Sequence, residues 1–167
     1  MKGVYFLLHL ASIFIISQAQ SIVSHPHALK SQNFNSIQKV GRTCSFIVII
    51  KTSCSSIQFT RDQISLAFGD AYGNKVYAPR IDDPTSRRFE RCVSDTFQIS
   101  GVCTYQICHV AFYRSGSDGW KPESVTIYGF NSRPVTFYYK RFIPRGVWFG
   151  FNHCSKASGF IITSTSN

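Results

Sequence analysis

The chain has 167 residues, 44% of them hydrophobic, and a formal net charge of +10. No segment reaches the roughly 18 apolar residues that a membrane-spanning helix needs, so we do not expect an integral membrane protein. All eight acidic residues lie between Asp62 and Glu123, whereas residues 124–167 contain basic residues and no acid. A basic surface of this kind suits an acidic glycan or an anionic lipid, and no nucleic-acid partner is expected.

The N-terminus has the features of an export signal. Lys2 precedes an apolar run over residues 4–16, and the small residues Ser17 and Ala19 follow this run. The order is typical of a signal peptide that is cleaved after Ala19, which predicts a secreted, extracellular protein. Residues 20–43 are polar and aperiodic and are predicted to be a flexible leader, as residues 155–167 are a flexible tail.

From residue 44 to residue 154 the sequence alternates between short apolar segments and turn residues. The run CSFIVIIK (44–51) is β-branched and nearly continuous, which predicts a strand that is buried on both faces. Pro79, in the segment after the GDAYGN turn, predicts an edge strand. No segment has the period of a helix, so we expect a single all-β, antiparallel sandwich. The predicted strands cover residues 44–51, 63–68, 75–80, 94–101, 105–114, 123–129, 134–140 and 146–152.

All six cysteines follow the predicted signal peptide. An even number in an exported chain predicts disulfides rather than a zinc site, although the sequence alone leaves the pairing open. Cys44 opens the first predicted strand and Cys154 closes the last, and we expect antiparallel end strands to bring them together. The remaining pairs would then be Cys103–Cys108 and Cys54–Cys92.

Several blocks of this region carry a family pattern. They include TRDQISLAFGDAYGN (60–74), DGWKPESVTIYG (118–129) and GVWFGFNHC (146–154). With them the chain resembles the embryo-specific protein 3 family of plants, which is similar to the PLAT, or lipoxygenase-homology, domains. The resemblance covers residues 44–154, which is the whole predicted domain.

The resemblance implies an eight-stranded β-sandwich of two four-stranded sheets that serves as a binding module. It further implies an association with embryo and seed development and a protein partner, for which lectins have been proposed. PLAT domains also dock on membranes, and some bind calcium in their loops. The chain departs from the calcium-binding pattern, because the loop after its first strand carries only Asp62 as an acid.

A calcium ion needs six to eight oxygen ligands, usually from several carboxylates. Such a site would have to gather acids from neighbouring loops, where each is more simply explained as a turn residue. We therefore predict no metal and no cofactor. The acids in question are Asp62, Asp70, Asp82, Asp83 and Asp118.

The sequence contains no serine-hydrolase elbow, no His-Glu-x-x-His zinc motif and no phosphate-binding glycine loop. A basic, disulfide-bonded, secreted domain is nevertheless compatible with a small hydrolase. In that case His109 and His153 would flank one phosphate, with Lys140 nearby. His109 lies among apolar residues of a strand and His153 next to a cysteine, so we predict structural histidines and no catalytic residue.

Trp120 has two interpretations, as a plug of the core or as an interfacial anchor at a membrane. Pro122 separates it from the strand that follows, so the ring can fold back over the sheet edge, and we favour the core.

The predicted function is therefore a secreted, non-catalytic module that binds a protein, a lectin or a glycan. A peripheral lipid-binding module is the alternative. The candidate partner contacts, chosen by charge, are Arg133, Lys140, Arg141 and Arg145.

Overall fold

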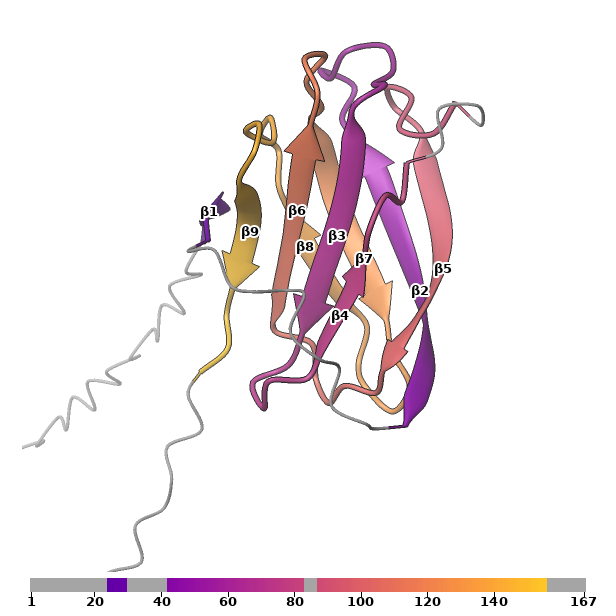
Figure 1. The fold of residues 1–167 in the computed structure, drawn as a ribbon, viewed down its shortest axis with the longest axis vertical. Coiled ribbons are helices and arrows are strands. Elements are labelled where there is room, and N and C mark those ends of the chain that lie inside the picture. The colour runs from indigo at the N-terminus through magenta and orange to yellow at the C-terminus, as the bar shows by residue number, and fades with distance from the viewer. Residues whose placement is uncertain (1–23, 30–41, 83–86, 156–167) are drawn as a thin grey trace, which may run out of the picture.

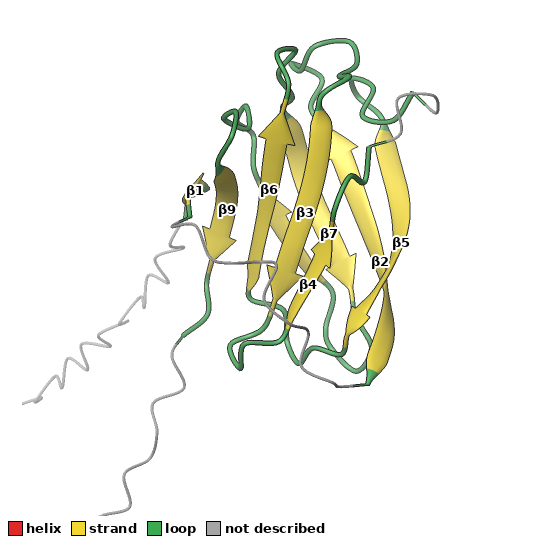
Figure 2. Ribbon diagram, viewed as in Figure 1, coloured by secondary structure: helices red, strands yellow, loops and turns green. Residues whose placement is uncertain are grey.

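The computed structural model describes residues 24–29, 42–82 and 87–155, and within these ranges it contains strands and no helix (Figures 1 and 2). The predicted signal peptide therefore lies outside the described residues. The described residues form nine strands: β1 (His27–Ala28), β2 (Thr43–Thr52), β3 (Gln63–Gly69), β4 (Lys75–Ala78), β5 (Ser94–Val102), β6 (His109–Ser115), β7 (Pro122–Tyr128), β8 (Val135–Tyr138) and β9 (Trp148–Asn152). No helix of the described part is long and apolar enough to cross a membrane.

The strands form two antiparallel sheets that pack face to face (Figure 1). One sheet has the order β1-β9-β6-β3-β4, and the other has the order β5-β2-β7-β8. The prediction of an all-β, antiparallel sandwich is confirmed. The strand count differs from the predicted eight, because residues 27–28 of the leader pair with β9 and extend one sheet.

Alternation along the strands fills the space between the sheets. In β2, Phe46, Val48 and Ile50 are at most 1% exposed and point inward, whereas Ile47 is 40% exposed. The prediction that this strand is buried on both faces is therefore wrong. β2 is a central strand of its sheet, but the outer face of a sandwich sheet has no further layer to cover it.

Trp120 belongs to the hydrophobic core and is fully buried. Its ring packs against Phe89 and Phe112, at centroid distances of 4.8 and 5.1 Å. Its indole N–H donates a hydrogen bond of 3.1 Å to the hydroxyl of Thr52 at the end of β2. Because the ring is buried and its N–H is hydrogen-bonded, Trp120 is a core residue and not an interfacial anchor.

Disulfides close both ends of the sandwich, with a pairing that differs from the expected one. Cys44 pairs with Cys103 rather than Cys154, and Cys108 pairs with Cys154. The expectation failed because β2 and β9 belong to different sheets, so the first and last long strands are not neighbours. The third disulfide joins Cys54 to Cys92 as expected. The Cys44–Cys103 and Cys54–Cys92 disulfides thus fasten the two ends of the β2–β5 strand pair.

Pro79 follows β4, which forms an edge of its sheet as predicted.

The leader is only partly described. Leu29 donates its backbone N–H to the carbonyl of Trp148 at 2.8 Å, so residues 24–29 are held along β9 rather than forming a flexible leader. Residues 20–23 and 30–41, and the tail beyond residue 155, lie outside the described part.

Candidate binding face

Three loops meet at the lower end of the sandwich in Figure 1. They connect β3 to β4 (residues 70–74), β5 to β6 (residues 103–108) and β7 to β8 (residues 129–134). We call this the Cys44 end, because the Cys44–Cys103 disulfide lies between these loops and the start of β2. A groove of about 860 Å³ opens here, and its lining includes Cys44 and Cys103 themselves.

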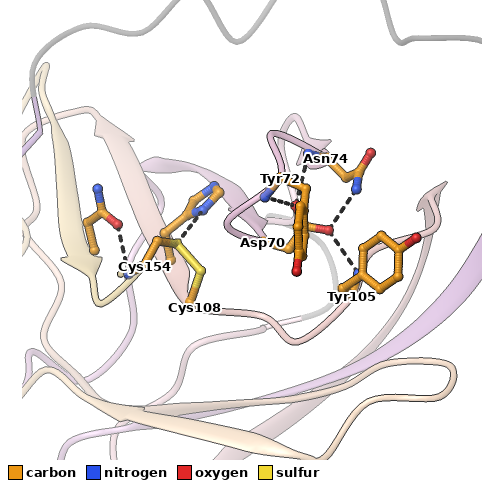
Figure 3. Close-up of a disulfide and its surroundings, with 8 residues drawn as sticks. Asp70, Tyr72, Asn74, Tyr105, Cys108 and Cys154 are labelled. Atoms are coloured by element: carbon orange, nitrogen blue, oxygen red, sulfur yellow. Dashed lines mark hydrogen bonds between the residues drawn. A yellow bond between two sulfur atoms is a disulfide. The ribbon is translucent and has the colours of Figure 1, made fainter. Parts of the chain in front are cut away.

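Asp70 organises the Cys44 end (Figure 3). This residue is 3% exposed, and its carboxylate accepts the backbone N–H groups of Tyr72 and Asn74 at 2.9 and 3.0 Å. It also accepts the side-chain amide of Asn74 at 2.7 Å and the backbone N–H of Tyr105 at 2.8 Å. One buried carboxylate therefore shapes the β3–β4 turn and ties it to the β5–β6 loop.

Large aromatic side chains project from these loops into solvent. Tyr72 and Tyr105 are 70% and 67% exposed, and their rings lie 4.9 Å apart. Phe130, in the β7–β8 loop, is 65% exposed and lines the groove together with Tyr105. Exposed aromatic side chains that gather at one end of a domain are typical of a surface that binds a partner.

Polar contacts hold the third loop against the second. The side-chain amide of Gln106 donates to the carbonyl of Arg133 and accepts its backbone N–H, both at 3.1 Å. The hydroxyl oxygen of Thr104, which also lines the groove, is buried without a hydrogen-bond partner among the described residues. The loops are thus fixed to each other by side chains, while one polar group of the groove wall remains unsatisfied.

His109 lies beside the Cys108–Cys154 disulfide at the same end. Its Nδ1 is 3.7 Å from Sγ of Cys154, and its Nε2 is buried without a hydrogen-bond partner in the described part. Burial lowers the pKa of His109 to about 4, and the positive charge of Lys75 also lowers it. The negative charge of Asp70 raises this pKa but does not outweigh the other two effects. The imidazole is therefore neutral at physiological pH.

The side-chain atoms of Cys108, His109 and Cys154 that could bind a metal lie within 4.8 Å of one another. Within the described ranges this is the one cluster of three or more histidine, cysteine or acidic side chains close enough to share a metal ion. The two sulfurs are joined to each other, and a metal needs the thiolate form. The oxidised chain thus offers one imidazole, which is too little for a metal site.

His109 and His153 do not face a common space. His109 pairs with Asn152 in the β6–β9 register, so His153, the next residue, projects toward the opposite side of the sheet. There the His153 ring packs against Phe137 and Phe151, at centroid distances of 5.6 and 5.4 Å, and its Nε2 contacts the hydroxyl of Ser24. Lys140 follows the C-terminal end of β8, two residues after Tyr138.

The upper end of the sandwich, which we call the Trp120 end, contains a buried ion pair. Arg114 is 8% exposed and Asp62 is 3% exposed, and the guanidinium contacts the carboxylate directly. Asp62 also accepts the backbone N–H groups of Asp118 and Gly119 at 3.0 Å. Burial raises the pKa of Asp62, but these hydrogen bonds and the Arg114 charge outweigh it, so the pKa lies below its usual value.

The acids do not form a calcium site. Arg114 already supplies the cation at Asp62, and Asp70 accepts four N–H donors. Asp82 accepts the backbone N–H of Ile64 at 2.9 Å, and Asp118 accepts that of Arg61 at 2.9 Å. A calcium ion would have to displace these donors, so the residues present do not fit it. Asp83 lies outside the described residues.

The basic residues that we selected by charge are not gathered at one place. Arg133 precedes β8 at the Cys44 end, whereas Lys140, Arg141 and Arg145 follow it at the Trp120 end. Six residues of nearly extended chain lie between Arg133 and Lys140, which places these two residues roughly 20 Å apart. Lys140 also lies 3.8 Å from the carboxylate of Glu123. A single partner contact through all four residues is therefore not supported.

Sequence reasoning missed the aromatic residues of the Cys44 end, because an aromatic in a short loop looks the same in sequence whether it is exposed or buried. A signal for their organiser was present. Asp70 is followed after two and four residues by Tyr72 and Asn74, a spacing typical of an aspartate that bonds the backbone of its own turn.

Solved structures with the same fold are lipoxygenases and a bacterial toxin. A lipoxygenase variant, Delta413-417:GS LOX, superposes with a TM-score of 0.56 at 18% identity, over 65% of this chain and 16% of that one. Alpha toxin from Clostridium absonum gives a TM-score of 0.54 at 19% identity, over 70% of this chain and 33% of that one. This likeness covers a small part of each of those proteins and shows the PLAT/C2-like sandwich fold.

Relatives with clear sequence similarity come from Arabidopsis thaliana. Embryo-specific protein ATS3B is 54% identical over 92% of this chain and 82% of its own length. Embryo-specific protein ATS3A is 49% identical over 96% of this chain and 93% of its own length. The family model "Embryo-specific protein 3, (ATS3)" matches residues 31–154. With this match over most of its length, the chain is a member of the embryo-specific protein 3 family.

Proposed function

We propose that this chain is a secreted, non-catalytic binding module, and that its partner docks at the Cys44 end. The observation that carries the proposal is a pair of exposed aromatic side chains, Tyr105 and Phe130, that line a groove, with the exposed Tyr72 ring against Tyr105. Three loops supply this surface, and Asp70, Gln106 and a disulfide hold them in place. Such pre-organisation lowers the entropy that binding costs.

The histidine geometry supports a non-catalytic role. General acid–base cleavage needs both groups within hydrogen-bond reach of one substrate, and His109 and His153 project from opposite sides of their sheet. His109 is also largely enclosed and neutral, with Gly69 so close that an added Cβ would contact its ring at 2.5 Å. The ring therefore fits a structural role beneath the β3–β4 turn.

Secretion is proposed on the predicted signal peptide and on the three disulfides, which form and persist in oxidising compartments. Membership of the embryo-specific protein family connects the module with seed development. The partner would then be a component of the extracellular space of the seed, with proteins and glycans as the candidates.

A retention experiment tests the proposed site. The full exported chain, with its disulfides intact, is immobilised and exposed to extracellular extract of developing seeds, and the retained protein and carbohydrate are identified. We expect Tyr105→Ala to abolish retention of the partner, because this ring is exposed at the groove. Tyr138→Ala is the matched control, since Tyr138 is 62% exposed on β8. Equal retention by both variants would contradict the site.

A second candidate function, peripheral lipid binding, is favoured by the Trp120 end. Phe59 and Phe142 are 40% and 50% exposed there. Arg61 lies 5.5 Å from the Phe59 ring and Lys121 lies 5.9 Å from the Phe142 ring. Exposed apolar rings next to cations suit an anionic membrane surface. This function predicts that Phe142→Ala weakens salt-sensitive binding to phosphatidylserine vesicles, whereas Tyr105→Ala leaves it unchanged.

A further inference from the structure

We propose that the groove at the Cys44 end binds an oligosaccharide that carries carboxylate groups, as in a polyuronate. The inference rests on the proposed binding function and names its ligand class. The groove volume of about 860 Å³ is in the range of sites that accommodate a small ligand or a short segment of a polymer. Both aromatic and polar side chains line it.

The aromatic side chains offer faces for sugar rings. A pyranose ring has an apolar face of C–H groups and a rim of hydroxyls, so it can stack on an aromatic ring while its rim stays polar. Tyr105 and Phe130 line the groove and are more than half exposed, and Tyr72 supports the Tyr105 ring from the other loop. Tyrosine provides rigid, amphipathic contact area at a low cost in conformational entropy.

The polar lining matches the hydroxyl rim. Asn74 and Asn131 line the groove, and their amides can donate and accept hydrogen bonds. The hydroxyl of Thr104 is unsatisfied within the described part of the chain. Rotation of this side chain can turn the hydroxyl toward the groove without breaking a protein hydrogen bond. A ligand rich in hydroxyl groups would therefore satisfy a polar atom that the protein leaves unpaired.

Charge selects an acidic sugar. Arg42 is exposed and lines the groove, and Arg133 is exposed on the loop that carries Phe130. In the described loops of the Cys44 end the one acid is Asp70, whose carboxylate is buried under four N–H donors. A uronate carboxylate would thus meet arginine without facing an exposed acid. Guanidinium groups bind carboxylates well, because two N–H groups can reach both oxygens.

The same features argue against a lipid surface as the occupant of this groove. Insertion into a bilayer would bury the amides of Asn74 and Asn131 away from water. Burying such groups without hydrogen-bond partners is unfavourable. A peptide ligand is the remaining class, and the experiment separates it from a glycan.

The test measures binding of the full exported chain to oligogalacturonate by isothermal titration calorimetry at low and physiological salt. The same experiment is repeated with methyl-esterified oligogalacturonate and with a neutral cello-oligosaccharide. The variants are Tyr105→Ala, Arg42→Gln and Thr104→Val, with Tyr138→Ala as the control. All three groove positions are at most partly buried, and thermal unfolding checks that each variant is folded.

The expected result is binding of oligogalacturonate that esterification weakens about tenfold, as the loss of one hydrogen-bonded charge would. Tyr105→Ala and Arg42→Gln should each weaken it by a similar factor, Thr104→Val should weaken it less, and Tyr138→Ala should leave it unchanged. Absence of binding, or binding that Tyr105→Ala and Arg42→Gln do not affect, would overturn the inference. If Tyr105→Ala nevertheless abolishes retention of a protein from seed extract, the proposed function stands and only the ligand class fails. If both experiments fail, both proposals fall.

Discussion

The carboxylate of Asp70 accepts the backbone N–H of Tyr105 at 2.8 Å, across 35 residues of sequence. This bond connects the turn after β3 to the loop before β6, and the same carboxylate shapes the turn itself. The neighbouring rings of Tyr72 and Tyr105, 4.9 Å apart, are consequently held by one buried acid. Stability and presentation of the aromatic surface are thus coupled at a single residue.

Replacement of Asp70 tests this coupling. Asp70→Ala leaves four N–H donors without their acceptor, and we expect a loss of about 3 kcal/mol in the free energy of unfolding. Asp118→Ala is the matched control, because the exposed Asp118 carboxylate accepts one backbone N–H and its loss should cost about 1 kcal/mol or less. Urea denaturation measures both. Equal costs would show that Asp70 does not organise the loops.

The buried pair of Asp62 and Arg114 should behave as a unit. Asp62→Asn leaves the Arg114 cation buried without its counter-charge, and we expect a cost of about 3 to 5 kcal/mol. Arg114→Met should cost a similar amount, and the double variant should cost clearly less than the sum of the two. A double-mutant cycle by chemical denaturation measures the coupling, and additive costs would contradict it.

His109 predicts a pH dependence of stability. Its pKa of about 4 in the folded chain lies below the value of about 6.5 expected for an unfolded histidine. The unfolded state therefore binds the proton first as the pH falls, and stability is fully present above about pH 6.5 and is lost toward pH 4. The difference corresponds to about 3 kcal/mol. Urea denaturation across this range, with His109→Gln as the comparison, measures it.

A comparison of the unchanged chain with His109→Gln separates the contribution of this histidine to the pH dependence of stability from that of the acids. His109→Gln should flatten the stability profile between about pH 6.5 and 4. Asp62 acts in a lower window, because its pKa is lowered from an ordinary value near 3.8, and its contribution is lost as the pH falls below that value. A profile that is the same with and without His109 would contradict burial of the neutral ring.

The disulfide pairing is testable by peptide mapping without reduction. We expect linked peptides that contain Cys44 with Cys103, Cys54 with Cys92 and Cys108 with Cys154. Replacement of both Cys44 and Cys103 by serine should cost about 4 kcal/mol in the chain-entropy model, since the bond spans 59 residues. A linked peptide with Cys44 and Cys154 would instead require the first and last long strands to be neighbours.

The strands were predictable because alternation is a local property. In β2 the apolar run predicted the strand but not its exposed face, and only the fold shows that Phe46, Val48 and Ile50 point inward. The cysteine pairs were not predictable, because the neighbour of Cys44 depends on which strands share a sheet. The site was predictable only in its charge. Arg133 was selected on this basis, but Tyr105 became visible only when the fold placed it at the groove.

The site itself is tested most directly by mapping amide chemical shifts of the isotopically labelled, full exported chain during titration with oligogalacturonate. The account predicts that the shifted amides cluster in the loops 70–74, 103–108 and 129–134, with Tyr105 among them. Shifts confined to residues 53–62 and 140–147 at the Trp120 end, or no shifts at saturating ligand, would contradict it.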